Sequence, residues 1–268
     1  MKFTKMHANG NDYIYIDTHA QELRDPRKNA ILLCDRHFGI GGDGLVLLCP
    51  CDTADFEMRI FDPDGTEAEL CGNALQCSAT LFARSYENHR EEVRVKTRAG
   101  VRRVSLRYSG NTVSEVSVTL PYPEVLFTDH RILLENRSFP STYLSFGNPH
   151  CAVWTNDLSD ANFFAHAPRL EQHPLFPCRA NVEFVQIISR SRFRMRTWER
   201  GCGETLSCST GSAAAVYAAY LQELCDAEVS VEQPGGIIAV KIDPAKEQMT
   251  VSSQARIVFR GEIPDFIQ

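Results

Sequence analysis

Three absences in the sequence exclude broad classes of protein. The chain has no excess of positive charge, because 28 Lys and Arg against 34 Asp and Glu leave a formal net charge of −6 at pH 7. This balance argues against nucleic acid as a partner. No apolar run approaches the roughly 18 to 20 residues of a membrane span, and residues 1–7 lack the apolar segment of a secretory signal. We therefore expect a cytoplasmic protein with no membrane or nucleic-acid partner.

The sequence also lacks the spacings that are typical of metal sites. It holds ten cysteines but no Cys-x-x-Cys or His-x-x-x-His pair, so it predicts no metal site. In a reducing compartment we expect thiols rather than disulfides. No lysine stands in a recognisable pyridoxal-phosphate setting, and we expect no cofactor. Seven cysteines are predicted to be small buried hydrophobic residues: Cys34, Cys49, Cys51, Cys77, Cys151, Cys178 and Cys225.

What the sequence does contain is two related halves. Cys71 and Cys208 set an offset of 137 positions (208 − 71), and other residues match at that same offset without a gap. An internal repeat of this kind indicates two versions of one structural unit. The matching pairs are Phe56 and Phe193, Met58 and Met195, Arg59 and Arg196, Glu67 and Glu204, and Gly10-Asn11 with Gly147-Asn148; Phe61 with Trp198 and Asp62 with Glu199 are chemically similar.

In each half, the sequence predicts a strand and a turn-rich loop, which leads through a cysteine into a helix. Residues 56–61 and 193–198 alternate as strands, and helices are predicted over about 73–87 and 211–224. We predict an α+β fold of two pseudo-symmetric lobes, 1–120 and 121–254, with Pro121 and Pro123 at the boundary. Each lobe is a mostly antiparallel sheet wrapped around a central helix, with the active site in the cleft between them. Further strands are predicted at 13–17, 45–48, 93–97, 101–108, 113–120, 151–154, 183–188, 237–242 and 249–259.

The position of the two cysteines points to chemistry. Cys71 precedes Gly72-Asn73 and Cys208 precedes Ser209-Thr210, and both contexts are typical of a helix N-terminus. Unpaired N–H groups and the helix dipole there favour a thiolate, and they can also hold a substrate carboxylate. If the lobes face each other, one thiolate removes a proton from a carbon and the other thiol protonates its opposite face. The alternative is two buried thiols that begin helices without a catalytic role.

Several segments resemble the diaminopimelate epimerase family, nearly end to end and in the family's order. The resemblance implies interconversion of LL- and meso-diaminopimelate, a small amino-acid substrate, for lysine and peptidoglycan synthesis, without cofactor or metal. It also implies that a final strand, about 255–268, joins the N-terminal lobe, and that the chain forms a homodimer. The matching segments are Lys5 to Tyr13, Asp64 to Asn73, Gly147 to His150, Asn181 to Val185 and Arg196 to Cys208.

Carried over by position, the resemblance assigns roles to individual residues. Cys71 and Cys208 are the acid/base thiols, and His150 and Glu199 tune the thiol pKa values. The forked guanidinium of Arg200 suits a second carboxylate, and amide side chains suit a zwitterion. Asp12, Glu67 and Glu204 are predicted to cap loops. Substrate binding falls on Asn11, Asp62, Gly72, Asn73, Asn148, Asn181, Glu199, Arg200, Ser209 and Thr210.

Some positions depart from the family's pattern. Asp62 stands where the family usually has Asn, Gln76 replaces an Arg near the first thiol, and Ala8, Ala74 and Ser209 replace glycines. None of these changes removes a proton-transfer group. They lead to the hypothesis that recognition of the distal end of the substrate is relaxed, so that glutamate is also racemised slowly.

Two other functions remain open from the sequence. A proline or hydroxyproline racemase of the same architecture usually carries Cys-Gly-His after the first thiol, and here the residue is Asn73. Such a substrate would also leave Arg200 without a carboxylate. A dithiol redox protein would cycle Cys71 and Cys208 through a disulfide, with no solvent exchange into an amino acid. A binding module without catalysis is disfavoured by the lack of ligand spacing.

Overall fold

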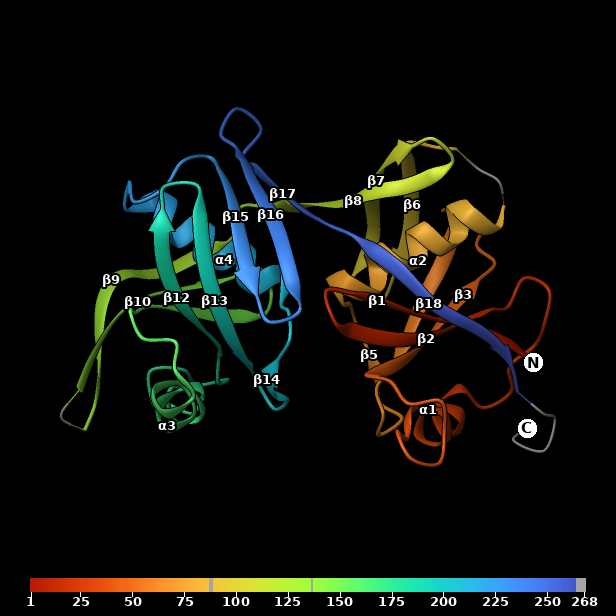
Figure 1. Ribbon diagram of the computed structural model, residues 1–268, viewed down its shortest axis with the longest axis horizontal. Coiled ribbons are helices and arrows are strands. Elements are labelled where there is room, and N and C mark those ends of the chain that lie inside the picture. The colour runs from red at the N-terminus through yellow and green to blue at the C-terminus, as the bar shows by residue number, and fades with distance from the viewer. Residues whose placement is uncertain (87–88, 136, 264–268) are drawn as a thin grey trace. The chain divides into compact units, whose positions relative to one another are not determined.

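The computed structural model describes residues 1–86, 89–135 and 137–263 (Figure 1). The end of the helix predicted over 73–87, and the part of the final strand predicted over 264–268, lie outside the described residues. The chain divides into two compact units, one of Met1–Val118 with the chain from Ser253 onward, the other of Thr119–Ser252.

The first unit is a curved sheet with a central helix and a second, shorter helix against it. Its strands are β1 (Lys2–Ala8), β2 (Asn11–Asp17), β3 (Gly44–Cys49), β4 (Phe56–Phe61), β5 (Glu67–Ala68), β6 (Glu92–Thr97), β7 (Gly100–Ser109), β8 (Thr112–Pro121) and β18 (Ala255–Glu262), and its helices are α1 (Pro26–Cys34) and α2 (Gly72–Ser85). Strands β2 and β3, and β4 and β6, pair in parallel; the other pairings described are antiparallel. Helix α2 contacts β1, β2, β3, β4, β6, β7 and β18, so the sheet wraps around it (Figure 1).

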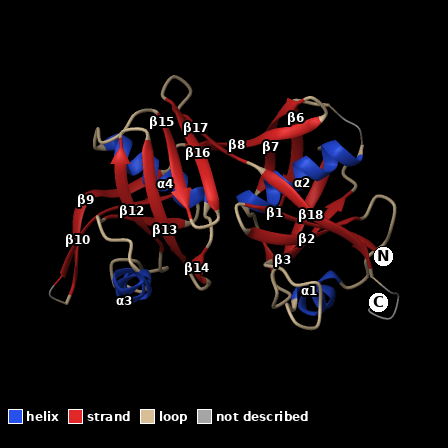
Figure 2. Cartoon of the chain, viewed as in Figure 1, coloured by secondary structure: helices blue, strands red, loops and turns tan. Residues whose placement is uncertain are grey.

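The second unit repeats this plan. It contains β9 (Glu124–Leu134), β10 (Arg137–Ser145), β11 (Pro149–Trp154), β12 (Asn181–Ser189), β13 (Arg192–Glu199), β14 (Gly203–Thr205), β15 (Glu228–Gln233), β16 (Gly236–Asp243) and β17 (Gln248–Ser253), with helices α3 (Asp160–Glu171) and α4 (Ser209–Leu221). Its parallel pairs, β11 with β12 and β13 with β15, are the counterparts of those in the first unit. Figure 2 shows strands predominating over helices in both units. The predicted α+β class with mostly antiparallel strands is confirmed.

The hairpin before each central helix has the same strand register and the same ion pair in both units, which supports the internal repeat. Ile60 pairs with Ala68 in the first unit and Thr197 with Thr205 in the second, which is the same register at the offset of 137. Both hairpins carry the same forked ion pair. Arg59 Nε and Nη2 donate to Glu67 at 2.7 and 3.1 Å. Arg196 Nε and Nη2 donate to Glu204 at 2.7 and 3.0 Å. The two glutamates therefore brace the hairpins.

Helix α4 is buried on almost every side, and its composition explains why this is possible. Its run Ala213–Ala214–Ala215 and the later Ala218 and Ala219 are fully buried. Alanine has high helix propensity and a small side chain, so strands can approach the helix axis closely. Residues of β13, β15, β16 and β17 complete this hydrophobic core. The position of Cys208 is therefore set by a helix held rigidly within its unit.

The structure differs from the predictions in one strand, in several elements that were not predicted and in the burial of three cysteines. The strand predicted over 249–259 is broken at Gln254 into β17 and β18, and β18 pairs antiparallel with β1. Strands β1, β5, β9, β10, β14 and β15 and helices α1 and α3 were not predicted. Cys178 is exposed rather than buried, and Cys49 and Cys51 are half-buried. Over the described ranges, no helix has the length and hydropathy to cross a membrane.

Candidate active site

The first candidate thiol, Cys71, stands immediately before α2. Its backbone is extended (φ −135°, ψ 123°), and it is the N-cap residue of the helix. Gly72 and Asn73 form the first turn, where backbone N–H groups and the helix dipole favour an anion. The prediction that Cys71 begins a helix is confirmed.

Side chains of β2 contact the Cys71 sulfur. Cys71 Sγ lies 3.5 Å from Asn11 Oδ1, and the Tyr13 hydroxyl donates to the sulfur at 3.3 Å. Asp43 holds Asn11 in place, because Asp43 Oδ2 accepts from Asn11 Nδ2 at 2.8 Å. Arg36 Nη2 in turn donates to Asp43 Oδ1 at 2.8 Å. The sequence pointed to Asn11, but Tyr13 and Asp43 were not singled out.

Asp12 lies next to Asn11 on β2, and Asp62 directly follows the last residue of β4. Asp12 forms ion pairs with Lys5 and with Arg36, the latter at 2.7 Å, which is consistent with a structural role. The Oδ2 atom of Asp62 accepts a hydrogen bond from Thr66 Oγ1 at 3.5 Å. Partial burial raises the pKa of Asp62, the charge of Asp64 adds to this, and the hydrogen bond from Thr66 opposes it.

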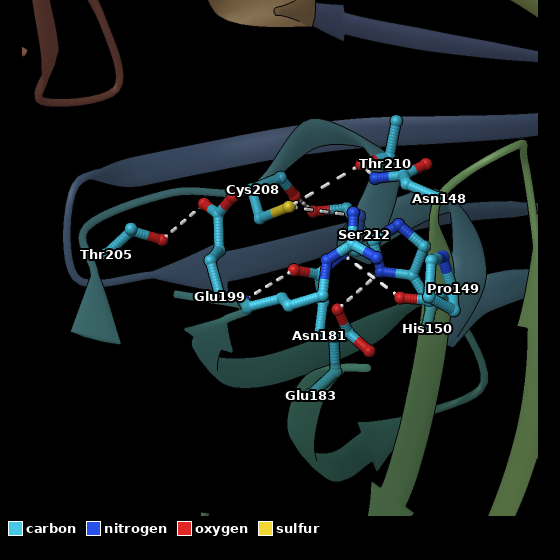
Figure 3. Close-up of polar contacts among 12 residues, drawn as sticks. Asn148, Pro149, His150, Asn181, Glu183, Glu199, Thr205, Cys208, Thr210 and Ser212 are labelled. Atoms are coloured by element: carbon cyan, nitrogen blue, oxygen red, sulfur yellow. Dashed lines mark hydrogen bonds and ion pairs between the residues drawn. The ribbon is translucent and has the colours of Figure 1, made fainter. Parts of the chain in front are cut away.

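The second candidate thiol, Cys208, is the N-cap of α4 and is buried (Figure 3). Its sulfur accepts from Gly211 N–H at 3.3 Å and lies 3.6 Å from Thr210 Oγ1. Gln233 orients the backbone here, because its Oε1 accepts from Cys208 N–H at 3.0 Å and its Nε2 donates to Ser212 Oγ at 2.9 Å. The prediction that Cys208 begins a helix is also confirmed.

Predicted substrate-binding residues gather around this helix end. Asn148 Nδ2 donates to Thr210 Oγ1 at 3.4 Å. Asn181 Nδ2 donates to the Pro149 carbonyl at 3.1 Å, and Asn181 Oδ1 accepts from Arg200 N–H at 2.8 Å. The exposed Arg200 guanidinium donates to the Cys178 carbonyl at 3.0 Å. Ser209 is the buried first residue of α4.

The surroundings of Cys208 act on its thiol in two directions. A helix N-terminus favours a thiolate, but burial raises the pKa of the Cys208 thiol well above its ordinary value of 9.0. The charges of Glu199 and Glu183 raise that pKa further, while hydrogen bonds from Thr210 and Gly211 lower it. Desolvation and the two acidic neighbours thus favour the protonated thiol at Cys208, and the helix end opposes them.

Glu199 is itself held in a buried position beside Cys208. Thr205 Oγ1 donates to Glu199 Oε1 at 2.6 Å (Figure 3). Burial raises the pKa of Glu199, whereas hydrogen bonds with Thr205 and Cys208 and the charge of His150 lower it. A carboxyl in this position adds negative charge next to the thiol whenever it is ionised.

His150 and Glu183 form a fully buried pair next to the same helix end. His150 Nδ1 lies 2.7 Å from Glu183 Oε1, and both side chains have 0% exposure. Gly211 makes their close approach to Cys208 possible. A Cβ on Gly211 would lie 2.7 Å from Glu183 Oε1 and 3.2 Å from Cys208 Sγ. Sequence reasoning singled out His150 but gave no role to Glu183, Gly211, Thr205 or Gln233.

The ten cysteines, all in the described part of the chain, are thiols. Within the same residues, no group of three or more His, Cys, Asp or Glu side chains is placed to hold a metal ion.

Comparison with known proteins identifies the family. A family model described as diaminopimelate epimerase matches residues 3–120 and 142–256. A diaminopimelate epimerase of Agathobacter rectalis is 39% identical over 282 residues, covering 98% of this chain and 99% of the relative. One of Bacteroides thetaiotaomicron is 39% identical over 263 residues, covering 98% of each chain.

Solved structures share the fold at low sequence identity. A phenazine biosynthesis protein of the PhzF family from Bacillus anthracis aligns with a TM-score of 0.75 at 17% identity, covering 98% of this chain and 99% of the other. A hydroxyproline epimerase from Agrobacterium vitis aligns with a TM-score of 0.73 at 16% identity, covering 97% and 91%. At this identity the likeness concerns the fold.

Proposed function

The chain belongs to the diaminopimelate epimerase family and is an isomerase, and we propose that Cys71 and Cys208 perform its reaction by two-base inversion at one α-carbon of diaminopimelate. The observation that carries this proposal is the equivalent placement of the two thiols. Each is the N-cap of the central helix of its unit, and each follows a hairpin with the same Arg–Glu ion pair. The mechanism requires the two sulfurs to lie on opposite faces of one bound substrate carbon.

We assign substrate binding to polar groups at the start of the two central helices. The first-turn N–H groups of α2 and α4 would hold the α-carboxylate, and Asn11, Asn148 and Thr210 would complete the polar contacts. Arg200 is exposed and donates only one described side-chain hydrogen bond, to a backbone carbonyl. Its guanidinium would exchange that contact for a forked ion pair with the distal carboxylate.

The proton steps balance without a cofactor. The Cys71 thiolate removes the proton from Cα, and the C–H electron pair delocalises into the α-carboxylate, whose negative charge the helix N–H groups stabilise. The Cys208 thiol then delivers its proton to the opposite face of the same carbon. The enzyme finishes with Cys71 as thiol and Cys208 as thiolate, the state from which the opposite stereoisomer reacts.

The assignment of Cys208 as the protonated partner rests on its surroundings. Burial and the charges of Glu199 and Glu183 raise its pKa, which keeps the proton on sulfur before substrate is turned over. We also propose that the protein is a cytoplasmic enzyme of lysine and peptidoglycan precursor synthesis. It would act on a small-molecule substrate as a homodimer.

Single replacement of each thiol tests the mechanism. Cys71→Ser and Cys208→Ser should each abolish inversion, because a hydroxyl has a far higher pKa than a thiol and cannot serve as the base at neutral pH. Inversion is followed by circular dichroism and α-hydrogen exchange by mass spectrometry in D2O. Cys77→Ser, in the buried part of α2, is the matched control and should retain activity. Epimerisation by either active-site variant at a rate near that of the wild type would contradict the two-thiol mechanism.

A further inference from the structure

Tyr13 contacts the candidate base directly. Its ring is buried, and its hydroxyl donates to Cys71 Sγ at 3.3 Å. The phenol lies on β2 two residues after Asn11, whose Oδ1 is 3.5 Å from the same sulfur. The sulfur therefore contacts both a donor O–H and an amide oxygen from the same strand.

Strand β3 leaves space for the Tyr13 ring at Gly44. Tyr13 pairs with Gly44 in the parallel register of β2 and β3. A Cβ on Gly44 would lie 2.8 Å from Tyr13 Cε1 and 3.0 Å from Tyr13 Cδ1, and it would also lie 2.8 Å from the Phe61 carbonyl oxygen. Because only glycine fits at position 44, the Tyr13 ring can lie against the backbone of β3, and its hydroxyl is held next to the Cys71 thiol.

The internal repeat gives Tyr13 a counterpart. At the offset of 137, Tyr13 corresponds to His150 and Gly44 to Asn181. These pairs also have the same register, because His150 pairs with Asn181 in the parallel pairing of β11 and β12. The same position beside the central helix thus carries a phenol in the first unit and an imidazole paired with Glu183 in the second.

We propose that Tyr13 is a further catalytic residue, whose O–H donates a hydrogen bond to Cys71 Sγ and stabilises that sulfur as the thiolate that removes the α-proton. This inference rests on the proposed function, since it assumes that Cys71 is a base. It makes the two thiols chemically unequal, with a neutral donor at Cys71 and carboxyls at Cys208.

The charge state of the phenol agrees with this role. Burial, with the negative neighbours Cys71 and Asp43, raises the pKa of Tyr13 well above its ordinary value of 10.0. Tyr13 therefore stays protonated and acts as a donor rather than as a base. Tyr15 and Cys77 also interact with Cys71, and burial raises the pKa of each of them as well.

The variant Tyr13→Phe removes the hydroxyl and leaves the ring on Gly44. A hydrogen bond to a charged group is of a strength that shifts a pKa by about one to two units. We expect the pH profile for alkylation of Cys71 by iodoacetamide, followed by mass spectrometry of the Cys71 peptide, to move up by about that amount. At pH values below the thiol pKa, α-hydrogen exchange should fall by about tenfold or more. Site-specific 3-fluorotyrosine at position 13, a more acidic donor, should move the profile in the opposite direction.

Tyr15→Phe is the matched control. Tyr15 lies two residues further along β2 and is buried, and its hydroxyl makes no hydrogen bond to the Cys71 sulfur. Its loss should leave the Cys71 profile unchanged. An unshifted profile in Tyr13→Phe, with Cys71→Ser inactive, would overturn the role of Tyr13 alone. An active Cys71→Ser variant would instead overturn the proposed function.

Discussion

Replacing Gly211 by alanine tests how closely the second half-site is packed. Gly211 is the third residue of α4, and an added Cβ would lie 2.7 Å from Glu183 Oε1, 3.1 Å from Glu183 Cγ and 3.2 Å from Cys208 Sγ. The contact with Glu183 Oε1 is shorter than real Cβ atoms show, so Glu183 or the helix must shift. Glu183 cannot shift freely, because its side chain is fully buried against His150.

The two effects on stability have opposite signs. Alanine in a helix is favoured over glycine by about 1 kcal/mol, whereas overpacking a well-packed core costs about 1 to 3 kcal/mol. We expect Gly211→Ala to lower the free energy of unfolding by about 1 kcal/mol, which would lower Tm by about 2 to 4 °C. The effect on catalysis should be larger, because misplacing a reacting group by about 1 Å can cost about 100-fold in rate.

Thermal unfolding and kcat for inversion are measured on the same preparation. Glu183→Asp shortens the side chain that the new Cβ meets, so the double variant should be less destabilised than the sum of the single variants. The packing argument fails if Gly211→Ala is both more stable than the wild type and equally active. It also fails if the two substitutions are additive in the free energy of unfolding.

Two further predictions concern charge. Glu199→Gln keeps an oxygen that can accept from Thr205 but removes a negative charge that raises the pKa of Cys208. The thiolate fraction should rise at a given pH, and alkylation of Cys208 should begin at lower pH. An unchanged profile would show that the charge of Glu199 does not contribute to this pKa. If Asp62 relaxes recognition of the distal end of the substrate, L-glutamate incubated with the protein in D2O should gain deuterium at Cα, and Asp62→Asn should lower this exchange relative to that of diaminopimelate. No deuterium in glutamate after long incubation, with diaminopimelate turned over normally, would end that hypothesis.

Local patterns in the sequence were enough to predict several elements. Strand β4 alternates buried and half-buried residues from Phe56 to Ile60, and the helices after Cys71 and Cys208 have clear start signals. Strand β9 was missed because most of its side chains are exposed and it shows no alternation. Strand β1 was missed for the opposite reason, since four consecutive residues from Phe3 to Met6 are buried.

The sequence by itself determined the α+β fold class, the internal repeat and the cysteine at the start of each central helix, because these depend on periodicity, register and capping along the chain. The tertiary structure decided how each thiol is surrounded. It placed the Tyr13 hydroxyl on Cys71 through the glycine at position 44, and Glu183 beside Cys208 through the glycine at position 211. It also buried Cys208 and placed two carboxyl groups where they raise its pKa. A thiol's pKa depends on the water excluded around it and on charges from distant parts of the chain, and neither is encoded by the residues next to it in sequence.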